Sequence, residues 1–448
     1  MTATTEPLAT TANLAYHERV RKILPGGVNY NFNMPWAEVP IHFSGGRGSR
    51  LFDVDGNEYL DLYARFGAMI LGHSNEEYLD ALSDAMRDVL CVSHTDFDAD
   101  ALELMNQHIP CAEMVRFGTS GSEILQIAIR LARGYTGRNK FVRFENHFHG
   151  SYDNIMGGRV PDRANPVPVD YRGDYKGTAG RAAGIMAEQS YMLPWSDAAA
   201  LETLLAERGD EIACVLLEPV CVNGGSVEPA PGYLEKVREL CTRYGVVLIF
   251  DEMITGVRMG LGGAQKTFGV TPDLATFGKA LAGGGMPIAA LAGKAEIMQL
   301  LESKRVVHAG TFNGYSLGSA GVRATFRILG RDDEAALVAM RRRVEAVHDV
   351  LLAEAARIGL PLIVQGPAGL ASFHCRETPL DTPDQYDFDL MGKDILLTAA
   401  LQRHGVLIST MSRIYANAQL TDDDVEFFAE RAPRALAEAK QQIDDIYS

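Results

Sequence analysis

Two stretches decide the fold: VVLIFDE at residues 246–252 and PDLATFGKALAGGG at residues 272–285. Each contains a short apolar run that ends in reactive side chains, with Asp251 and Glu252 closing the first run and Lys279 following the second. Uninterrupted Val-, Ile- and Leu-rich runs are typical of a parallel sheet that is covered on both faces. Such sheets bind their ligands at the carboxyl ends of the strands. We therefore expect an α/β protein whose chemistry lies around Asp251 and Lys279.

Similar apolar runs flank these two, separated by segments with helical spacing, and they lie at residues 114–117, 140–144, 212–217 and 288–292. Past Gly318, helical stretches at 332–358, 389–404 and 422–446 alternate with short strands at 361–365, 370–375 and 405–409. Near the start, residues 14–24 have helical spacing, and the alternation around Asp55-Gly56 predicts a hairpin. We expect a large domain at residues 75–320. Residues 1–74 and 321–448 are expected to form a smaller α+β domain.

The composition is that of an ordinary globular protein. The chain has 448 residues, of which 47% are hydrophobic and 22% charged, and its net charge is −16. An acidic chain without a basic stripe is a poor candidate for nucleic-acid binding, and no stretch approaches the ~18 apolar residues of a membrane span. Six dispersed cysteines predict free thiols, and residues 1–15 lack the pattern of a secretory signal. We expect a cytoplasmic protein that binds neither nucleic acid nor membrane.

Lys279 and Asp251 each have a functional and a structural interpretation. A lysine at a strand end beside Gly278 is expected to be partly buried, and burial makes an amine a better Schiff-base former. The alternative is a solvated lysine in a flexible loop. A carboxylate at the position of Asp251 can hold a pyridine nitrogen in its protonated form. It can equally cap a helix or form a structural ion pair.

The stretch RFGTSGSE at residues 116–123 predicts a small-residue turn between a strand and a helix. The free N–H groups at such a helix start suit a phosphate, and Ser122 can add a hydroxyl; a plain helix cap is the alternative. No Walker A or Gly-x-Gly-x-x-Gly motif follows a strand, which disfavours nucleotide cofactors. In ENHFHG, residues 145–150, Phe148 can stack on a flat ring or pack in the core. The His-x-His pair there lacks the third ligand of a zinc site, so no metal is expected.

The order of these elements, with Glu218-Pro219 between them, resembles that of the fold-type I pyridoxal-phosphate enzymes, class III aminotransferases in particular. Within this class the chain is most similar to the glutamate-1-semialdehyde 2,1-aminomutase branch. The similarity is carried by LPGGVN (24–29), MILGH (69–73), DEMITGVR (251–258), FGVTPD (268–273) and GTFN (310–313). It covers about residues 20–330 and implies a mostly parallel seven-stranded sheet, an aminotransferase activity and pyridoxal 5′-phosphate as the cofactor.

The resemblance also implies which residues contact the cofactor ring. Lys279 matches the lysine that carries the cofactor as a Schiff base, and Asp251 matches the partner of the ring nitrogen. Phe148 stands at the position of the stacking aromatic residue, and Asn223 at that of an asparagine near the phenolic oxygen. Met253 replaces a usual valine behind the ring, which exchanges one apolar contact for another.

The resemblance further implies how the phosphate is held. Gly121 and Ser122 match the phosphate-binding turn. Thr311 matches a threonine that reaches the phosphate of the neighbouring subunit's cofactor, so a homodimer with shared active sites is expected.

One departure from the aminomutase pattern bears on the substrate. Asn33 stands where the aminomutases have the arginine that holds the substrate carboxylate, and an amide cannot supply a bidentate charged contact. Arg65, where a small residue is expected, and Arg413 are candidates for a relocated carboxylate contact, although Arg65 can also serve a structural ion pair; Arg258 is expected to be structural. We therefore expect transfer from a small-molecule amino donor to a keto or aldehyde acceptor. The alternatives are an intramolecular aminomutase, a racemase or epimerase, and a non-enzymatic cofactor-binding protein.

Overall fold

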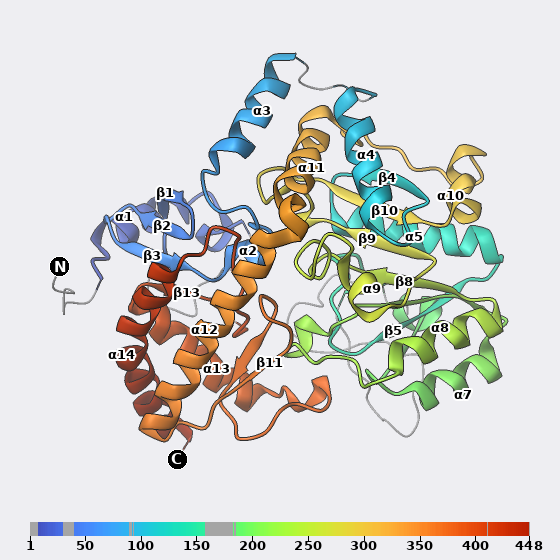
Figure 1. Cartoon of the computed structure of the whole chain (residues 1–448). Coiled ribbons are helices and arrows are strands. Elements are labelled where there is room, and N and C mark those ends of the chain that lie inside the picture. Colours follow the sequence, from blue (N-terminus) through green and yellow to red (C-terminus); the bar gives the residue numbers. More distant parts are fainter. Residues whose placement is uncertain are drawn as a thin grey trace. The chain divides into compact units, whose positions relative to one another are not determined.

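The computed structural model describes residues 8–29, 40–88, 92, 94–156, 182, 185–409 and 411–447, coloured along the chain in Figure 1. The chain divides into two compact units. The first consists of Met1–Glu76, Ala336–Pro379 and Tyr386–Ser448, and the second of Glu77–Ala335 with Leu380–Gln385. The second unit continues past residue 320, where the sequence suggested a boundary.

Helix α11 (Ser316–Leu329) explains the later boundary, because it packs on α4 (Asp96–His108) within the second unit. Its buried face is rich in small residues, among them Gly318 and Ser319, which allow close approach of the two helices. The Ser319 hydroxyl donates a hydrogen bond to the Asp98 carboxylate. This helix therefore completes the second unit.

A seven-stranded sheet with the order β4-β10-β9-β8-β7-β5-β6 forms the centre of the second unit (Figure 1). The strands are β4 (Met114–Gly118), β5 (Lys140–Phe144), β6 (Ser190–Leu193), β7 (Ile212–Leu217), β8 (Val247–Asp251), β9 (Leu274–Phe277) and β10 (Ala289–Gly293). Only β10 runs antiparallel to its neighbours; the other pairs are parallel. The expected mostly parallel α/β sheet is confirmed, and β6 is the strand that the sequence did not predict.

Helix α5 (Gly121–Thr136) covers much of this sheet, because it packs against β4, β10, β9, β8 and β7. Its apolar residues Ile124, Ile127, Ala128 and Leu131 are buried in one core with residues of the strands. The other helices of the unit are α3 (Glu76–Asp88), α6 (Ile185–Gln189), α7 (Ala198–Arg208), α8 (Tyr233–Tyr244), α9 (Gly263–Phe268) and α10 (Ala295–Glu302). The strand ends are thereby left as the places where polar side chains gather.

The first unit is built around a four-stranded sheet with the order β1-β2-β3-β13. Its elements are α1 (Thr11–Val20), β1 (Phe43–Arg47), β2 (Arg50–Asp53), β3 (Glu58–Asp61), α2 (Ala64–Gly67), α12 (Ala335–Ile358), β11 (Ile363–Gln365), β12 (Ser372–His374), α13 (Phe388–Arg403), β13 (Val406–Leu407) and α14 (Asp422–Tyr447). The hairpin of β2 and β3 turns at Gly56, whose φ of 85° explains the glycine. Strand β13 pairs with β3 in parallel, and Arg50 Nε donates to Asp424 Oδ1 at 2.6 Å. The N-terminal and C-terminal segments thus share one sheet.

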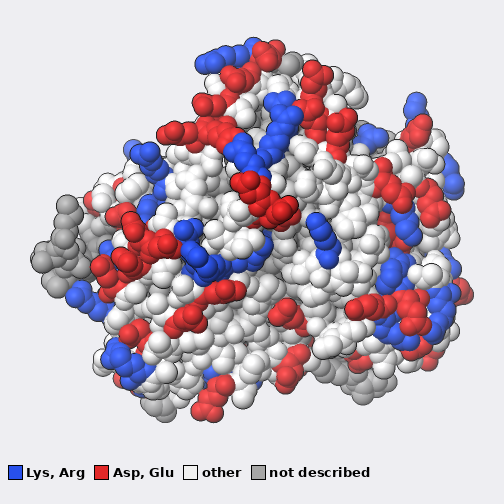
Figure 2. Space-filling view, viewed as in Figure 1, with Lys and Arg blue, Asp and Glu red and all other residues white. Residues whose placement is uncertain are grey.

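Charges of both signs are interspersed over the face drawn in Figure 2. Several are paired, for example Arg327 with Asp100 at 2.6 Å and Arg343 with Asp422 at 2.8 Å. Such exposed pairs stabilise a fold by only ~0–1 kcal/mol each. Within the described part of the chain, no helix is both long enough and apolar enough to cross a membrane.

Candidate active site

Asp251 is the last residue of β8, and its side chain is almost fully buried in the second unit, with the residue 3% exposed. Its Oδ2 lies 2.8 Å from His149 Nδ1. Its Oδ1 accepts the backbone N–H of Met253 at 3.1 Å and the Thr276 hydroxyl at 3.4 Å. A buried carboxylate is costly unless such partners satisfy it, so these contacts also fix its orientation.

The neighbouring carboxylate, Glu252, serves a different purpose. It accepts the backbone N–H groups of Ala264 at 2.7 Å and Gln265 at 3.1 Å, at the start of α9, and the Thr255 hydroxyl at 2.8 Å. Burial raises the pKa of Glu252, and these hydrogen bonds act in the opposite direction. These contacts explain why a carboxylate is buried at Glu252, so this side chain has a structural role.

Lys279 follows β9 and opens the short 3-10 helix η4 (Lys279–Ala282). Strands β8 and β9 are adjacent and parallel, with Asp251 in register with Thr276, so Lys279 and Asp251 follow the same end of the sheet. Lys279 is half-buried and has a φ of 47°. A left-handed backbone costs a non-glycine residue ~1–2 kcal/mol and is retained where the surrounding structure imposes it. The position of this amine is therefore set by the fold.

Met253 connects the lysine turn with the start of α5. A Cβ atom added at Gly121 would lie 2.8 Å from the Met253 sulfur, and one added at Gly278 would lie 2.7 Å from the same atom. Both glycines are thus packed directly on one side chain. The turns that carry Gly121, Asp251 and Lys279 consequently meet at one place.

The phosphate turn predicted at Gly121 and Ser122 is the N-terminus of α5. Ser120 caps the helix by accepting the backbone N–H of Glu123 at 3.3 Å. Ser122 Oγ accepts the Ser151 N–H at 3.2 Å, and a Cβ at Gly150 would lie only 2.4 Å from that oxygen. The N–H groups of this first turn and the positive end of the helix dipole suit an anion.

Phe148 and Asn223 are held by the same buried carboxylate. Glu218 Oε1 accepts the Phe148 N–H at 2.6 Å, and the Asn223 amide lies 2.9 and 3.1 Å from the two Glu218 oxygens. Burial raises the pKa of Glu218; nearby Asp251 adds to this effect, and His149 opposes it. Glu218 thus organises two of the expected cofactor contacts, a role that its place in the sequence did not reveal.

The two histidines of the His-x-His pair also have hydrogen-bonding roles. His147 Nδ1 accepts the Glu218 N–H at 3.0 Å, and burial lowers the pKa of His147 well below its ordinary value. His149 pairs with Asp251, as described above. His149 was not identified as a partner of Asp251 from the sequence. The available signal was its position beside Phe148, just after a strand.

Thr311 lies in an exposed stretch between α10 and α11. Its neighbours Phe312 and Val307 are 53% and 62% exposed. Within this chain, Thr311 therefore faces solvent.

Of the expected substrate residues, Arg65 and Arg413 belong to the first unit. Asn33 lies outside the described residues. Arg65 is exposed and sits in a left-handed run, with a φ of 50°. Arg413 is 4% exposed, and its Nη2 lies 2.9 Å from the Met411 sulfur. Arg258, expected to be structural, is only 1% exposed.

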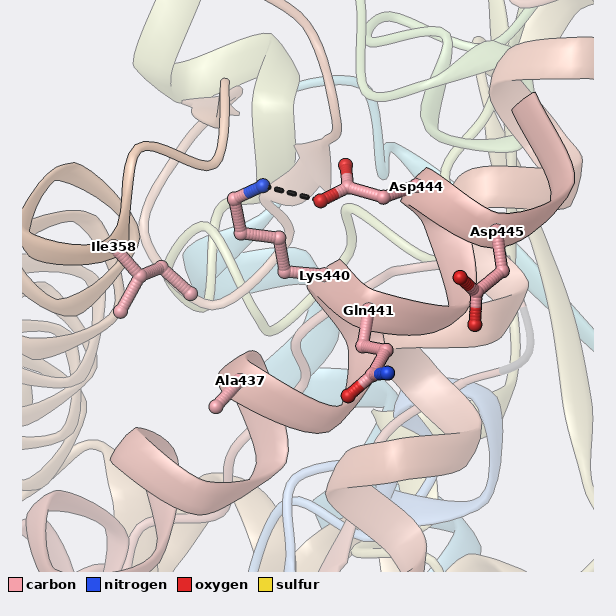
Figure 3. A pocket seen from close by; sticks show the side chains of 6 residues that line it. All are labelled: Ile358, Ala437, Lys440, Gln441, Asp444 and Asp445. Atoms are coloured by element: carbon pink, nitrogen blue, oxygen red, sulfur yellow. Dashed lines mark hydrogen bonds and ion pairs between the residues drawn. The ribbon is translucent and has the colours of Figure 1, made fainter. Parts of the chain in front are cut away.

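A separate surface pocket of about 340 Å³ lies in the first unit between the end of α12 and α14 (Figure 3). It is lined by Ile358, Ala437, Lys440, Gln441, Asp444 and Asp445. The Lys440 ammonium pairs with Asp444 at 2.5 Å. None of the expected site residues lines it, so we do not regard it as the active site.

The residues of the second unit fit pyridoxal 5′-phosphate. Gly121 and Gly278 leave no side chain over Met253, the start of α5 can receive a phosphate, and Asp251 and Lys279 supply the carboxylate and the amine. Among the described residues there is no group of three side chains able to hold a metal ion. This donor set suits an anionic, aldehyde-bearing pyridine.

Comparison with known proteins gives a consistent result. The family model for class-III aminotransferases matches residues 33–424. The glutamate-1-semialdehyde 2,1-aminomutase of Desulfotalea psychrophila is 36% identical over 385 residues, which is 83% of this chain and 86% of the relative. That of Methanospirillum hungatei is 40% identical over 327 residues, 70% of this chain and 74% of the relative. An omega-transaminase structure from Sphaerobacter thermophilus has a TM-score of 0.88 at 29% identity, over 96% of this chain and 98% of that chain.

Proposed function

Because the chain belongs to the class-III aminotransferase family, we propose that it moves an amino group between two molecules, with Lys279 and Asp251 as its catalytic residues. Enzymes of this family use pyridoxal 5′-phosphate, and the proposed reaction transfers nitrogen from an amino acid or amine to a keto or aldehyde acceptor. The observation that carries the assignment of residues is the meeting of three turns at Met253, which packs on Gly121 and Gly278 beside the Asp251–His149 pair.

When bound, pyridoxal 5′-phosphate supplies an electron sink for the charge that forms when the substrate carbon loses a proton. Lys279 would hold the cofactor through Nζ. When it is free of that bond, Nζ would be the general base that takes a proton from the substrate carbon and later gives it back. The constrained backbone of Lys279 supports this role, because it limits where the amine can move.

Asp251 would keep the ring nitrogen protonated, and His149 orients the carboxylate for that contact. Phe148 would stack on the ring, and Asn223, held by Glu218, would approach the phenolic oxygen. Gly121 and Ser122 would bind the phosphate at the start of α5. The side chains of Asp251, Asn223 and Ser122 are already held by protein contacts, so little reorganisation would be needed during the reaction.

We propose intermolecular transfer over the aminomutase reaction. The reason is Asn33, which lacks the charge of the arginine that the resemblance predicts at its position, while Arg65 and Arg413 offer other places for a carboxylate. An arginine–carboxylate pair in a dehydrated pocket is worth several kcal/mol, whereas a hydrogen bond to a neutral amide returns only ~1 kcal/mol. The identity to glutamate-1-semialdehyde 2,1-aminomutases favours the second candidate, intramolecular transfer.

The pure enzyme can decide between the two. An amino donor added alone should bleach the cofactor's absorption band, and a keto acid should restore it. Glutamate-1-semialdehyde without an added keto acid should yield little 5-aminolevulinate. Efficient formation of 5-aminolevulinate would contradict intermolecular transfer and establish the aminomutase.

We also propose a homodimer in which Thr311 contacts the cofactor phosphate of the partner subunit. Support comes from the exposed apolar side chains near Thr311. Phe312, Val307 and Val92 are 53%, 62% and 47% exposed, and the Val92 carbonyl accepts the Ser316 N–H at 2.9 Å, at the start of α11. Exposed apolar residues that cluster near a functional residue mark a surface for association.

Mixing two impaired variants tests the shared site. Lys279→Ala destroys the chain's own site, and Thr311→Val weakens the site of its partner. After subunit exchange between equal amounts, heterodimers contain one intact site each, so about a quarter of the wild-type activity should return. A mixture that stays as inactive as its components, or a fully active monomer in sedimentation, would refute the shared site.

A cytoplasmic location is proposed from the cysteines. The five described ones, Cys111, Cys214, Cys221, Cys241 and Cys375, are buried free thiols. Free thiols of this kind are characteristic of reducing compartments.

A further inference from the structure

The segment that leads to Thr311 is fastened along α5 by successive contacts within the second unit. Val306 is buried against Gly134, where an added Cβ would lie 2.9 Å from its methyl carbon. One turn earlier on the helix, Arg130 Nη1 donates to the Val307 carbonyl at 3.1 Å. At the first turn, His308 Nε2 lies 2.8 Å from Glu123 Oε1. The segment thus runs back along the helix toward the phosphate turn.

Glu123 is the link between the phosphate turn and this segment. Its second oxygen, Oε2, accepts both the N–H of Thr119 at 3.0 Å and the Thr119 hydroxyl at 2.7 Å. Burial alone would raise the pKa of Glu123, but the hydrogen bonds from His308 and Thr119 hold it below its ordinary value. The carboxylate is therefore ionised at neutral pH and is shared between the turn before α5 and His308.

His308 is well placed to fix the position of the segment that leads to Thr311. Its side chain is only 2% exposed, whereas that of Glu123 is 23% exposed. It lies three residues before Thr311, and its Nε2 donates its proton to the ionised Glu123 carboxylate. A buried side chain in such a charge-assisted hydrogen bond has little freedom to change its geometry.

We propose that the Glu123–His308 pair is a positioning pair that fixes Thr311 relative to the phosphate turn of Gly121 and Ser122. This rests on the proposed phosphate roles of Gly121, Ser122 and Thr311. Since Thr311 serves the partner's cofactor, the pair ties the phosphate contacts of one active site to those of the other. Its loss should weaken the hold on the cofactor's phosphate and leave the ring contacts intact.

The experiment measures the dissociation constants of apoenzyme for pyridoxal 5′-phosphate and for pyridoxal, which lacks the phosphate. His308→Gln replaces the rigid imidazole with a flexible amide, and Glu123→Gln removes the charge of the acceptor, so each should weaken binding of the phosphorylated form about tenfold. Binding of pyridoxal should change less than twofold. The double variant should be no weaker than either single variant, since both remove the same contact.

Two further variants make the result specific. His404→Gln makes the same change in a more exposed pair, with Glu438 at 2.9 Å in the first unit, and should alter neither constant. Ser122→Ala tests the phosphate turn itself. Selective weakening by Ser122→Ala without any effect of His308→Gln would overturn the positioning pair alone. If neither variant discriminates between the two ligands, the phosphate assignment is wrong as well. Equal weakening of both ligands by His308→Gln would also overturn the proposal.

Discussion

Replacing Asp251 with asparagine is the most direct test of the catalytic site, because it preserves size and removes charge. The amide oxygen can take the place of Oδ1 and still accept the Met253 N–H. The amide nitrogen then occupies the place of Oδ2, 2.8 Å from His149 Nδ1. That ring nitrogen must give up its proton to accept a hydrogen bond, and the proton moves to Nε2, which is buried without a hydrogen-bond partner among the described residues.

The expected magnitudes follow from these contacts. One unsatisfied buried donor costs ~1–3 kcal/mol, so the Asp251→Asn variant should fold with a modestly lower melting temperature. Removing one partner of a buried ion pair costs ~3–5 kcal/mol. If the pair with the ring nitrogen contributes this much to the reaction, turnover should fall roughly 200- to 5000-fold.

The assay compares kcat/KM for a fixed amino donor at full cofactor occupancy, which is verified by absorbance. Glu252→Gln is the matched control, because Glu252 is the next residue, is equally buried and is committed to the start of α9. It should lower stability and leave turnover close to wild type. An Asp251→Asn enzyme within about threefold of the wild-type rate would refute the reasoning, as would an equal loss in Glu252→Gln.

Two other predictions concern single side chains. Borohydride reduction followed by peptide mapping should place the pyridoxyl group on Lys279; finding it on Lys294 or Lys304 would displace Lys279 from the mechanism. Burial lowers the pKa of His348, in α12, to about 4, so the native state keeps this side chain neutral. Its contribution to the free energy of unfolding is present above the unfolded pKa of ~6.5 and is lost as pH falls from there to about 4. His348→Leu should therefore remove up to about 3 kcal/mol of the change in unfolding free energy between about pH 6.5 and pH 4, measured by urea titration at each pH. An unchanged dependence of this free energy on pH would contradict the assignment.

The position of Asp251 and Lys279 at one end of the sheet was predictable because strand ends are readable from local patterns. Asp251 and Lys279 each follow an apolar run, and adjacent parallel strands bring such ends together. Strand β6 was not predicted, because its four residues, SYML, follow α6 directly and no Gly or Pro separates the strand from the helix.

The partners of the site residues depend on the order of the strands in the sheet. His149 and Asp251 are 102 residues apart, and β5, which precedes His149, is separated from β8 by β7. No local sequence pattern reveals the order of the strands in the sheet. The left-handed backbone at Arg65 is likewise unpredictable, since nothing in Ala-Arg-Phe favours a positive φ.

The shared sheet of the first unit also sets the order in which the protein can fold during synthesis. Ser49 donates to Asp424, which lies 375 residues later in the chain. At 5–20 residues per second, a ribosome needs roughly 20 to 75 s to make that interval. Strand β3 must wait through this time for β13, whereas Glu77–Ala335, the bulk of the second unit, emerges as one continuous stretch. The unit that contains Lys279 and Asp251 can therefore begin to fold while β3 is still without β13, which leaves that edge of the N-terminal hairpin open to pairing with other chains.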